Sequence, residues 1–134
     1  MRVIVSPTSR KNRTEVMAAK VIFVIFRRSD LAREACLEQW NGERHGAVVR
    51  KTPGLRKWTQ NHVVSEEGER MPDGIGELWF DDMEALQAAM NSAEMGAAVE
   101  DAKNFLDMDK TYAVVVDEKK CLLRKICGLH WGVN

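Results

Sequence analysis

The sequence lacks an excess of either charge, is poor in cysteine and has no long apolar run, and each absence excludes a class of protein. Its 20 basic and 20 acidic side chains give a formal net charge of zero, which argues against a nucleic-acid-binding surface. No apolar run reaches the ~18 residues of a membrane span, and the N-terminus has no apolar stretch of secretory length. The three cysteines form no C-x-x-C pair and indicate free thiols in a reducing compartment. We therefore expect a cytoplasmic protein that binds neither nucleic acid nor a membrane.

Signals for a phosphate-binding loop and for a metal site are also missing. The chain contains no glycine-rich phosphate loop. The histidines, which are His45, His62 and His130, show no ligand spacing. Cys36 lies on the apolar flank of a predicted helix, where a small core residue is a better interpretation than a nucleophile. The sequence therefore predicts no metal site.

The chain is organised around the stretch from Cys36 to Leu55, which contains a tryptophan, a histidine and a proline. Its pattern predicts one amphipathic helix over about 30–51 that ends before Pro53, because proline disfavours helical geometry in the residue before it. The stripe on one side of this helix recurs every three or four residues and is formed by Leu37, Trp40, Arg44 and Val48.

His45 lies roughly 80° from the centre of that stripe, at the border between core and solvent. Two interpretations stay open: a helix-border histidine that offsets the helix dipole, or a titrating group that reaches a ligand. Gly42 costs about 1 kcal/mol relative to alanine in the middle of a helix. A local bulge, or the close approach of another group, would explain that glycine.

Four segments rich in β-branched and aromatic residues predict strands, at 20–28, 55–64, 75–80 and 110–116. The second and third are joined by the turn signal Pro72-Asp73-Gly74 and are expected to form an antiparallel hairpin. Helical periodicity recurs at 81–90 and, after Asn91-Ser92, at about 93–104. The order β-α-β-β-α-β predicts an α+β, ferredoxin-like fold, with a four-stranded antiparallel sheet and its helices on one face. Apolar groups on the open face of such a sheet predict a dimer.

Both ends of the chain fall outside this pattern and are basic. We expect an N-terminal extension at 1–18, one domain at 19–117 and a C-terminal tail at 118–134. The extension is polar and without periodicity, so it is not expected to bury enough surface to offset its ordering entropy. The tail is either a short amphipathic helix that docks on the domain or on a partner, or a loose segment.

Several motifs follow one another across the predicted domain. Leu37-x-x-Trp40 with His45 downstream comes first, followed by the segment T-P-G-L-R-K-W-T-Q-N-H-V at 52–63. The later motifs are D-G-I-G-E-L-W-F-D at 73–81, A-L-Q-A-A at 85–89 and N-F-L-D at 104–107. In this order, over about 19–117, they resemble the EthD family of dimeric α+β-barrel proteins, named for a protein of ethyl tert-butyl ether degradation. In the family the helix tryptophan and histidine are usually four residues apart, whereas here they are five apart, which turns the histidine by roughly 100° unless a π-bulge at Gly42 compensates.

The resemblance implies a small apolar pocket between sheet and helices, a homodimer formed through the sheets, and neither a metal nor a bound organic cofactor. Members and relatives of the family include lactone isomerases, small-molecule dehydratases and decarboxylases, cofactor-free oxygenases and pathway accessory proteins. Two functions stay open. One is a cofactor-independent enzyme of oxidoreductase, isomerase or lyase type that acts on a small hydrophobic or aromatic metabolite. The other is a non-catalytic dimeric protein that binds a small ligand or assists a degradation or biosynthesis pathway.

In the enzyme hypothesis, His45 is the general acid or base that transfers a proton to or from the substrate. Aromatic walls for a flat ligand and polar groups that orient it would come from Trp40, Trp58, Gln60, Asn61, His62, Glu77 and Trp79. Strand alternation lets Gln60 act together with His62, or Asn61 act alone. Each of these residues has a structural alternative: core packing for the aromatic residues, a solvated strand end for His62, and an ion pair with Arg56 or Lys57 for Glu77.

Overall fold

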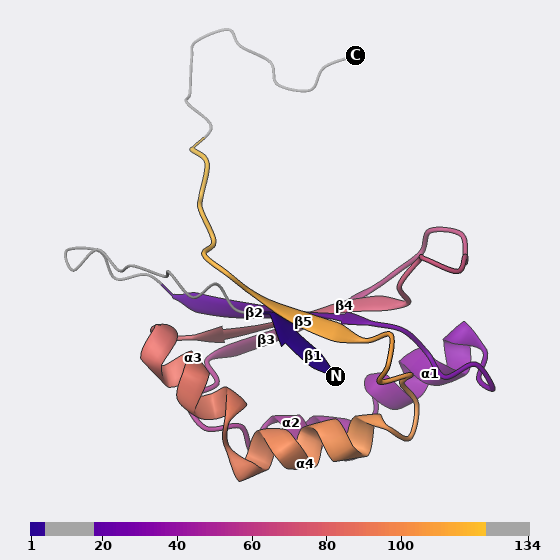
Figure 1. Ribbon diagram of the computed structural model, residues 1–134, viewed down its shortest axis with the longest axis horizontal. Coiled ribbons are helices and arrows are strands. Elements are labelled where there is room, and N and C mark those ends of the chain that lie inside the picture. The colour runs from indigo at the N-terminus through magenta and orange to yellow at the C-terminus, as the bar shows by residue number, and fades with distance from the viewer. Residues whose placement is uncertain (5–17, 123–134) are drawn as a thin grey trace, which may run out of the picture.

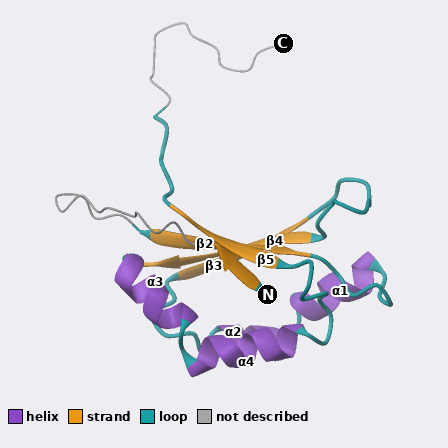
Figure 2. Cartoon of the chain, viewed as in Figure 1, coloured by secondary structure: helices purple, strands orange, loops and turns teal. Residues whose placement is uncertain are grey.

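A computed structural model describes residues 1–4 and 18–122 of the chain. Within these ranges the strands are β1 (Arg2–Ile4), β2 (Ala19–Ile25), β3 (Lys57–His62), β4 (Gly74–Phe80) and β5 (Tyr112–Val116). The helices are α1 (Arg33–Trp40), α2 (Glu43–Val49), α3 (Met83–Met90) and α4 (Ala93–Ala102). The described strands form one sheet in the order β1-β5-β2-β4-β3, and Figures 1 and 2 show the helices together on one of its faces. The predicted ferredoxin-like α+β architecture is confirmed.

The sheet differs from the prediction by one strand at its edge. Strand β1 pairs in parallel with β5, with Arg2 opposite Tyr112 and Ile4 opposite Val114. We expected no ordered structure here, because the N-terminal extension is polar, basic and without periodicity. The other pairs, β2 with β4, β2 with β5 and β3 with β4, are antiparallel as predicted. Most of the predicted extension and of the predicted C-terminal tail lies outside the described residues.

The predicted helix over 30–51 is interrupted, and this interruption determines where its second half points. Helix α1 ends at Trp40, and Gly42 is the extended N-cap residue of α2, with φ −79° and ψ 161°. A Cβ at Gly42 would lie 3.2 Å from the backbone oxygen of Glu38 and 3.3 Å from that of Gln39, which is tighter than most real contacts. The break therefore takes the place of the bulge that we considered. The predicted break at Asn91-Ser92 is confirmed, and the Ser92 hydroxyl accepts a hydrogen bond from the Met95 amide.

A glycine-lined floor on the sheet receives the side chain of Trp40. In β4 every second residue is buried against the helices, which puts Gly74 and Gly76 on the helix-covered face. A Cβ at Gly74 would lie 2.5 Å from Cζ3 of Trp40, and one at Gly76 would lie 3.1 Å from Cζ2 of the same ring. A Cβ at Gly74 would overlap the indole, and one at Gly76 would be closer to it than most real contacts. The floor fixes Trp40 at the junction of the sheet and α1.

A buried ion pair ties α1 to the connection between β3 and β4. Arg33 Nε lies 2.9 Å from Asp73 Oδ1, and both side chains are less than one-tenth exposed. The guanidinium also donates to the backbone oxygen of Ser65 at 2.6 Å. Asp73 in turn accepts a hydrogen bond from the amide of Arg27 at 2.8 Å. These contacts hold the connection between β3 and β4 against α1.

Candidate active site

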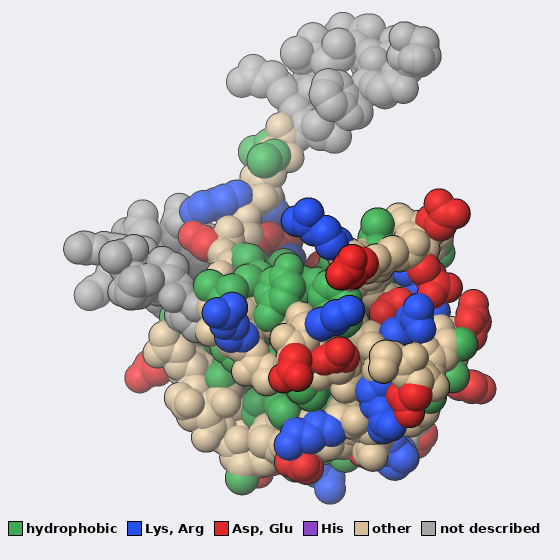
Figure 3. All heavy atoms as spheres, turned by 45° about the vertical axis from the view of Figure 1, so that its right-hand side comes forward, with side chains coloured by type: hydrophobic (Ala, Val, Ile, Leu, Met, Phe, Trp, Pro, Cys, Tyr) green, Lys and Arg blue, Asp and Glu red, His purple; other side chains and the backbone are tan. Residues whose placement is uncertain are grey.

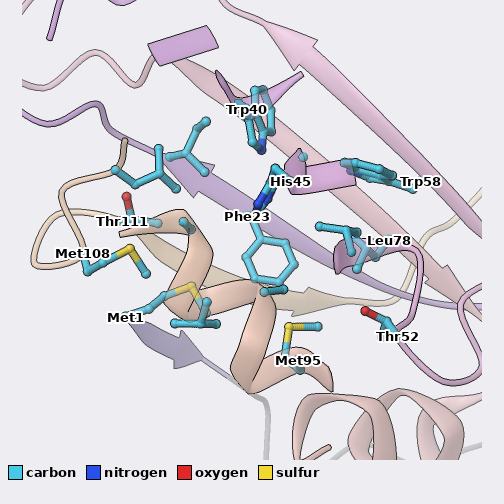
Figure 4. Close-up of a pocket in the computed structure, with 17 residues that line it drawn as sticks. Met1, Phe23, Trp40, His45, Thr52, Trp58, Leu78, Met95, Met108 and Thr111 are labelled. Carbon is cyan, nitrogen blue, oxygen red and sulfur yellow. The ribbon is translucent and has the colours of Figure 1, made fainter. Parts of the chain in front are cut away.

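A cavity lies between the helix-covered face of the sheet and helices α2 and α4 (Figure 4). Its volume is about 60 Å³. The wall is almost entirely apolar, and its larger side chains include Phe23, Ile25, Trp40, Trp58, Leu78 and Met95. Met1 and Met108 also line it. The implied pocket between sheet and helices is therefore present, with three flexible methionines in its wall.

His45 is the one ionisable side chain that the described structure places on this wall. The interruption of the helix turns it inward, so it is 5% exposed rather than at the border between core and solvent. Its Nδ1 lies 2.9 Å from Asp101 Oδ2, and its ring stands edge-on to Phe105 at 5.0 Å between centroids. The sequence-based placement of His45 at the helix border is wrong, whereas its placement beside a pocket agrees with the structure.

The contact with Asp101 determines which nitrogen of His45 carries the proton. An ionised carboxylate only accepts hydrogen bonds, so Nδ1 is the protonated nitrogen and Nε2 keeps its lone pair. Burial lowers the pKa of His45 below its ordinary value, although the hydrogen bond and the charge of Asp101 oppose this shift. His45 is therefore neutral near pH 7, and its basic nitrogen is the one that Asp101 does not engage. Such a group accepts a proton from a bound molecule.

Asp101 is the residue of the candidate site that sequence reasoning missed. It lies in α4, 56 residues after His45, and its other oxygen is 3.1 Å from Nε of the exposed Arg44. Ala98 and Ala102 of the same helix line the cavity. The sequence shows only that Asp101 is an acidic residue next to the stripe of small residues of α4. It does not reveal which side chain Asp101 faces in the fold.

Three of the predicted binding residues lie together on β3, on the side facing the helices. Trp58 lines the cavity, Gln60 Nε2 donates to the backbone oxygen of Trp40 at 2.9 Å, and Gln60 Oε1 is 2.9 Å from His62 Nε2. The His62 ring stacks on Trp40 with 5.3 Å between centroids. Gln60 and His62 thus share one face, as strand alternation predicted. They line a shallow outer groove with Asn41 and Trp58 rather than the cavity itself.

The remaining predicted residues lie on the open face of the sheet. Asn61 donates to the backbone oxygen of Ile75 at 2.8 Å. Glu77 lies 3.7 Å from Lys20 Nζ, so the predicted ion pair with Arg56 or Lys57 is wrong. The indole nitrogen of Trp79 donates to Glu118 at 3.0 Å. The structure does not bring these three side chains to the cavity.

The sulfur and metal chemistry of the described residues is limited. Cys36 is fully buried among core residues, and burial raises the pKa of its thiol to about 12. A thiol that stays protonated is a poor nucleophile. In the part of the chain that the structure describes, no group of three or more histidine, cysteine or carboxylate side chains is arranged to hold a metal ion. The same part contains no helix that is both long and apolar enough to cross a membrane.

The fold and the cavity define a ferredoxin-like α+β protein with a small apolar site that contains one histidine–carboxylate pair. The chain belongs to the EthD family, because the EthD domain matches residues 28–109. A solved EthD-family protein of Bacillus halodurans C-125 is 28% identical, with a TM-score of 0.63, over 77% of this chain and 100% of that one.

More distant solved structures share the fold. A dimeric ferredoxin-like protein of Thermobifida fusca YX is 12% identical, with a TM-score of 0.56, over 78% of this chain and 93% of its own. SnoaB, a cofactor-independent oxygenase of Streptomyces nogalater, is 10% identical, with a TM-score of 0.54, over 81% of this chain and 99% of its own. The comparison with curated proteins finds no match.

Proposed function

We propose that this protein is a cofactor-independent enzyme that removes a proton from a small, uncharged hydrophobic or aromatic metabolite, with His45 as the general base. The observation that carries the proposal is the neutral imidazole that lines an apolar cavity while Asp101 engages its other nitrogen. In an apolar site, the positive charge that forms on His45 after proton transfer is stabilised by the carboxylate beside it. The fold shared with SnoaB, whose reaction is described as cofactor-independent, is compatible with this chemistry.

Proton removal is the first step common to the reaction types that stay open. An isomerase returns the proton to a different atom, a lyase expels a leaving group, and an oxidoreductase passes the electron pair of the broken bond to an oxidant. The apolar wall and the aromatic side chains Trp40 and Trp58 favour a flat, uncharged ring as the substrate. His45 performs the same step in each case.

Deuterium exchange tests this role without knowledge of the natural substrate. Small cyclic ketones, lactones and phenols are incubated with the protein in D2O, and the uptake of deuterium at carbon is followed by NMR. The wild type is expected to accelerate exchange of at least one compound, and His45→Gln is expected to lose about 100- to 10,000-fold of that acceleration. His62→Gln is the matched control, because His62 is exposed and does not line the cavity.

One observation favours the second candidate, a non-catalytic binding or accessory protein. The cavity of about 60 Å³ is smaller than the ~150 Å³ cavity that holds a benzene ring. A ring-sized ligand therefore requires the methionine side chains of the wall to move. If no compound shows exchange above that caused by buffer, while ring-sized ligands still shift the NMR signals of cavity residues, the accessory function replaces the enzyme.

We also propose that the protein is a homodimer assembled through the open face of the sheet. Half-buried apolar side chains alternate along that face, and they are Ile22, Val24, Ile75, Tyr112, Val114 and Val116. Figure 3 shows hydrophobic side chains gathered below the point where the C-terminal segment leaves the domain, with charged side chains around them. Apolar surface of this kind is characteristic of association sites, and the Thermobifida fusca protein of the same fold is dimeric.

A charge placed on this face is expected to dissociate the dimer. Val114 lies on β5, with its side chain on the open face, so Val114→Glu buries an unpaired carboxylate in the dimer but exposes it to water in the monomer. Light scattering coupled to size-exclusion chromatography is expected to give a dimer mass for the wild type and a monomer mass for the variant. Gln87→Glu, on the exposed side of α3, is expected to stay dimeric. A monomeric wild type, or a dimeric Val114→Glu protein with a wild-type melting temperature, contradicts this interface.

A further inference from the structure

Besides the indole rings, three side chains with polar atoms line the cavity, and two of them have assigned partners. His45 Nδ1 bonds Asp101. The Thr111 hydroxyl accepts a hydrogen bond from the Phe26 amide at 3.1 Å and lies 3.5 Å from the carbonyl oxygen of the same residue, to which it donates. The third side chain is Thr52, whose hydroxyl has no hydrogen-bond partner among the described residues. Thr52 is only 4% exposed.

The hydroxyl of Thr52 makes no hydrogen bond within its own turn. A threonine near the end of a helix commonly bonds a carbonyl three or four residues back. Here the Val49 carbonyl accepts the Thr52 amide at 3.0 Å and the Val48 carbonyl accepts the Lys51 amide at 3.2 Å, but neither accepts the Thr52 hydroxyl. Figure 4 shows the Thr52 oxygen on the side of Leu78 and Met95, which are residues of the cavity wall. A buried hydroxyl without a partner is unfavourable unless a bound molecule completes it.

We infer that Thr52 anchors the ligand, by donating its hydroxyl hydrogen to an oxygen of a bound cyclic ketone or lactone. This inference deepens the proposed function and rests on it. Nε2 of His45 carries a lone pair and cannot donate to a carbonyl oxygen, whereas the Thr52 hydroxyl can. No lysine or arginine lines the described cavity wall, so the anchored oxygen belongs to an uncharged group rather than to a carboxylate.

The two groups have different roles toward the ligand. His45 lies in α2, Thr52 follows in the turn after the end of that helix at Val49, and both side chains line the cavity. Thr52 contacts the carbonyl oxygen of the ligand, and His45 contacts a hydrogen on the carbon next to the carbonyl, which is the acidic hydrogen of a ketone or lactone. When His45 takes that hydrogen as a proton, the C–H bond breaks, an N–H bond forms, and the electron pair of the broken bond moves into the carbonyl group to give an enolate. The hydrogen bond from Thr52 strengthens as negative charge develops on that oxygen.

A matched pair of probes measures the contribution of the Thr52 hydroxyl to ligand binding. Cyclohexanone and methylenecyclohexane have nearly the same shape, but only the ketone accepts a hydrogen bond. Both are titrated by NMR into the full chain, into Thr52→Val, which keeps the shape and removes the hydroxyl, and into Thr52→Ser, which keeps the hydroxyl. The wild type and Thr52→Ser are expected to prefer the ketone, and Thr52→Val is expected to lose about tenfold of that preference.

The outcomes separate this inference from the proposed function. If Thr52→Val keeps the wild-type preference for the ketone, or weakens the binding of both probes equally, Thr52 is a packing residue. The inference is then wrong, whatever the role of His45. If the preference falls as expected but deuterium exchange of the ketone does not depend on His45, Thr52 is an anchor in a binding protein, and the catalytic proposal fails. If neither probe binds the wild type, the cavity does not take up ring-sized ligands and both are overturned.

Discussion

Asp101→Asn is expected to lower His45-dependent deuterium exchange by about 100- to 10,000-fold without unfolding the protein. Arg44 Nε lies 3.1 Å from Asp101 Oδ1 and only donates hydrogen bonds, so in the variant it holds the amide oxygen on its own side. The amide NH2 then faces His45 Nδ1, which must accept. The proton of the imidazole moves to Nε2, and the cavity loses its base.

The double variant Arg44→Met/Asp101→Asn distinguishes this mechanism from a general loss of structure. Without the guanidinium the amide is free to turn its oxygen toward Nδ1, which restores the original tautomer and part of the exchange rate. Nitrogen NMR of the imidazole reports the tautomer directly. Arg44→Met alone is expected to have a small effect, since Arg44 is exposed. An Asp101→Asn protein with the wild-type rate contradicts the role of Asp101.

The exchange rate is also expected to depend on pH through His45 itself. Burial lowers the pKa of His45 below its ordinary value of 6.5. The neutral, basic form of the imidazole therefore predominates above pH 6.5 and is lost as the pH falls through the lowered pKa. Protonation in the unfolded chain begins at higher pH than in the folded protein, and the contribution of this group to stability therefore decreases below about pH 6.5. A rate that rises only well above pH 7 assigns the base to another residue.

Asp73→Ala is expected to lower the free energy of unfolding by about 3–5 kcal/mol. The substitution leaves the guanidinium of Arg33, which is less than one-tenth exposed, without its carboxylate, and it removes the acceptor of the Arg27 amide. Urea denaturation followed by tryptophan fluorescence measures the loss. The stability of this domain is expected to depend on this pair more than on any exposed one.

Asp81→Ala is the matched control for this experiment. Asp81 also pairs with an arginine through two hydrogen bonds, at 3.0 and 2.8 Å to Arg56, but that pair is exposed to solvent. Water and salt screen such a pair, so its loss is expected to change stability very little. Equal losses for Asp73→Ala and Asp81→Ala contradict the view that burial determines the effect.

The local patterns of the sequence predicted the order of elements because each pattern depends on a few neighbouring residues. The apolar run at 20–28 and the turn at Pro72-Asp73-Gly74 are signals of this kind, and they placed β2 and the β3–β4 hairpin. The same alternation correctly grouped Gln60 with His62. Strand β1 was not predicted, because three residues are too few to show a periodic pattern. Its pairing with β5 also joins segments that are far apart in the sequence.

The candidate site was less predictable, since it depends on contacts between distant segments. His45 was identified as a candidate from its motif, but its burial follows from the break at Gly42, which an average helical period does not describe. The partnership with Asp101 joins two helices 56 residues apart. The unpartnered hydroxyl of Thr52 is recognised only once its burial and its lack of a hydrogen-bond partner are known from the folded structure.

The two members of the histidine–carboxylate pair come from different halves of the fold. His45 belongs to α2, in the connection between β2 and β3, and Asp101 belongs to α4, in the connection between β4 and β5. Neither half contains both His45 and Asp101, so the pair that we propose as the base and its partner forms only when the two halves of the fold pack together. The rate at which exchange activity returns during refolding is therefore expected to report when the two halves pack together. Fragments that end before α4 are expected to show no exchange activity.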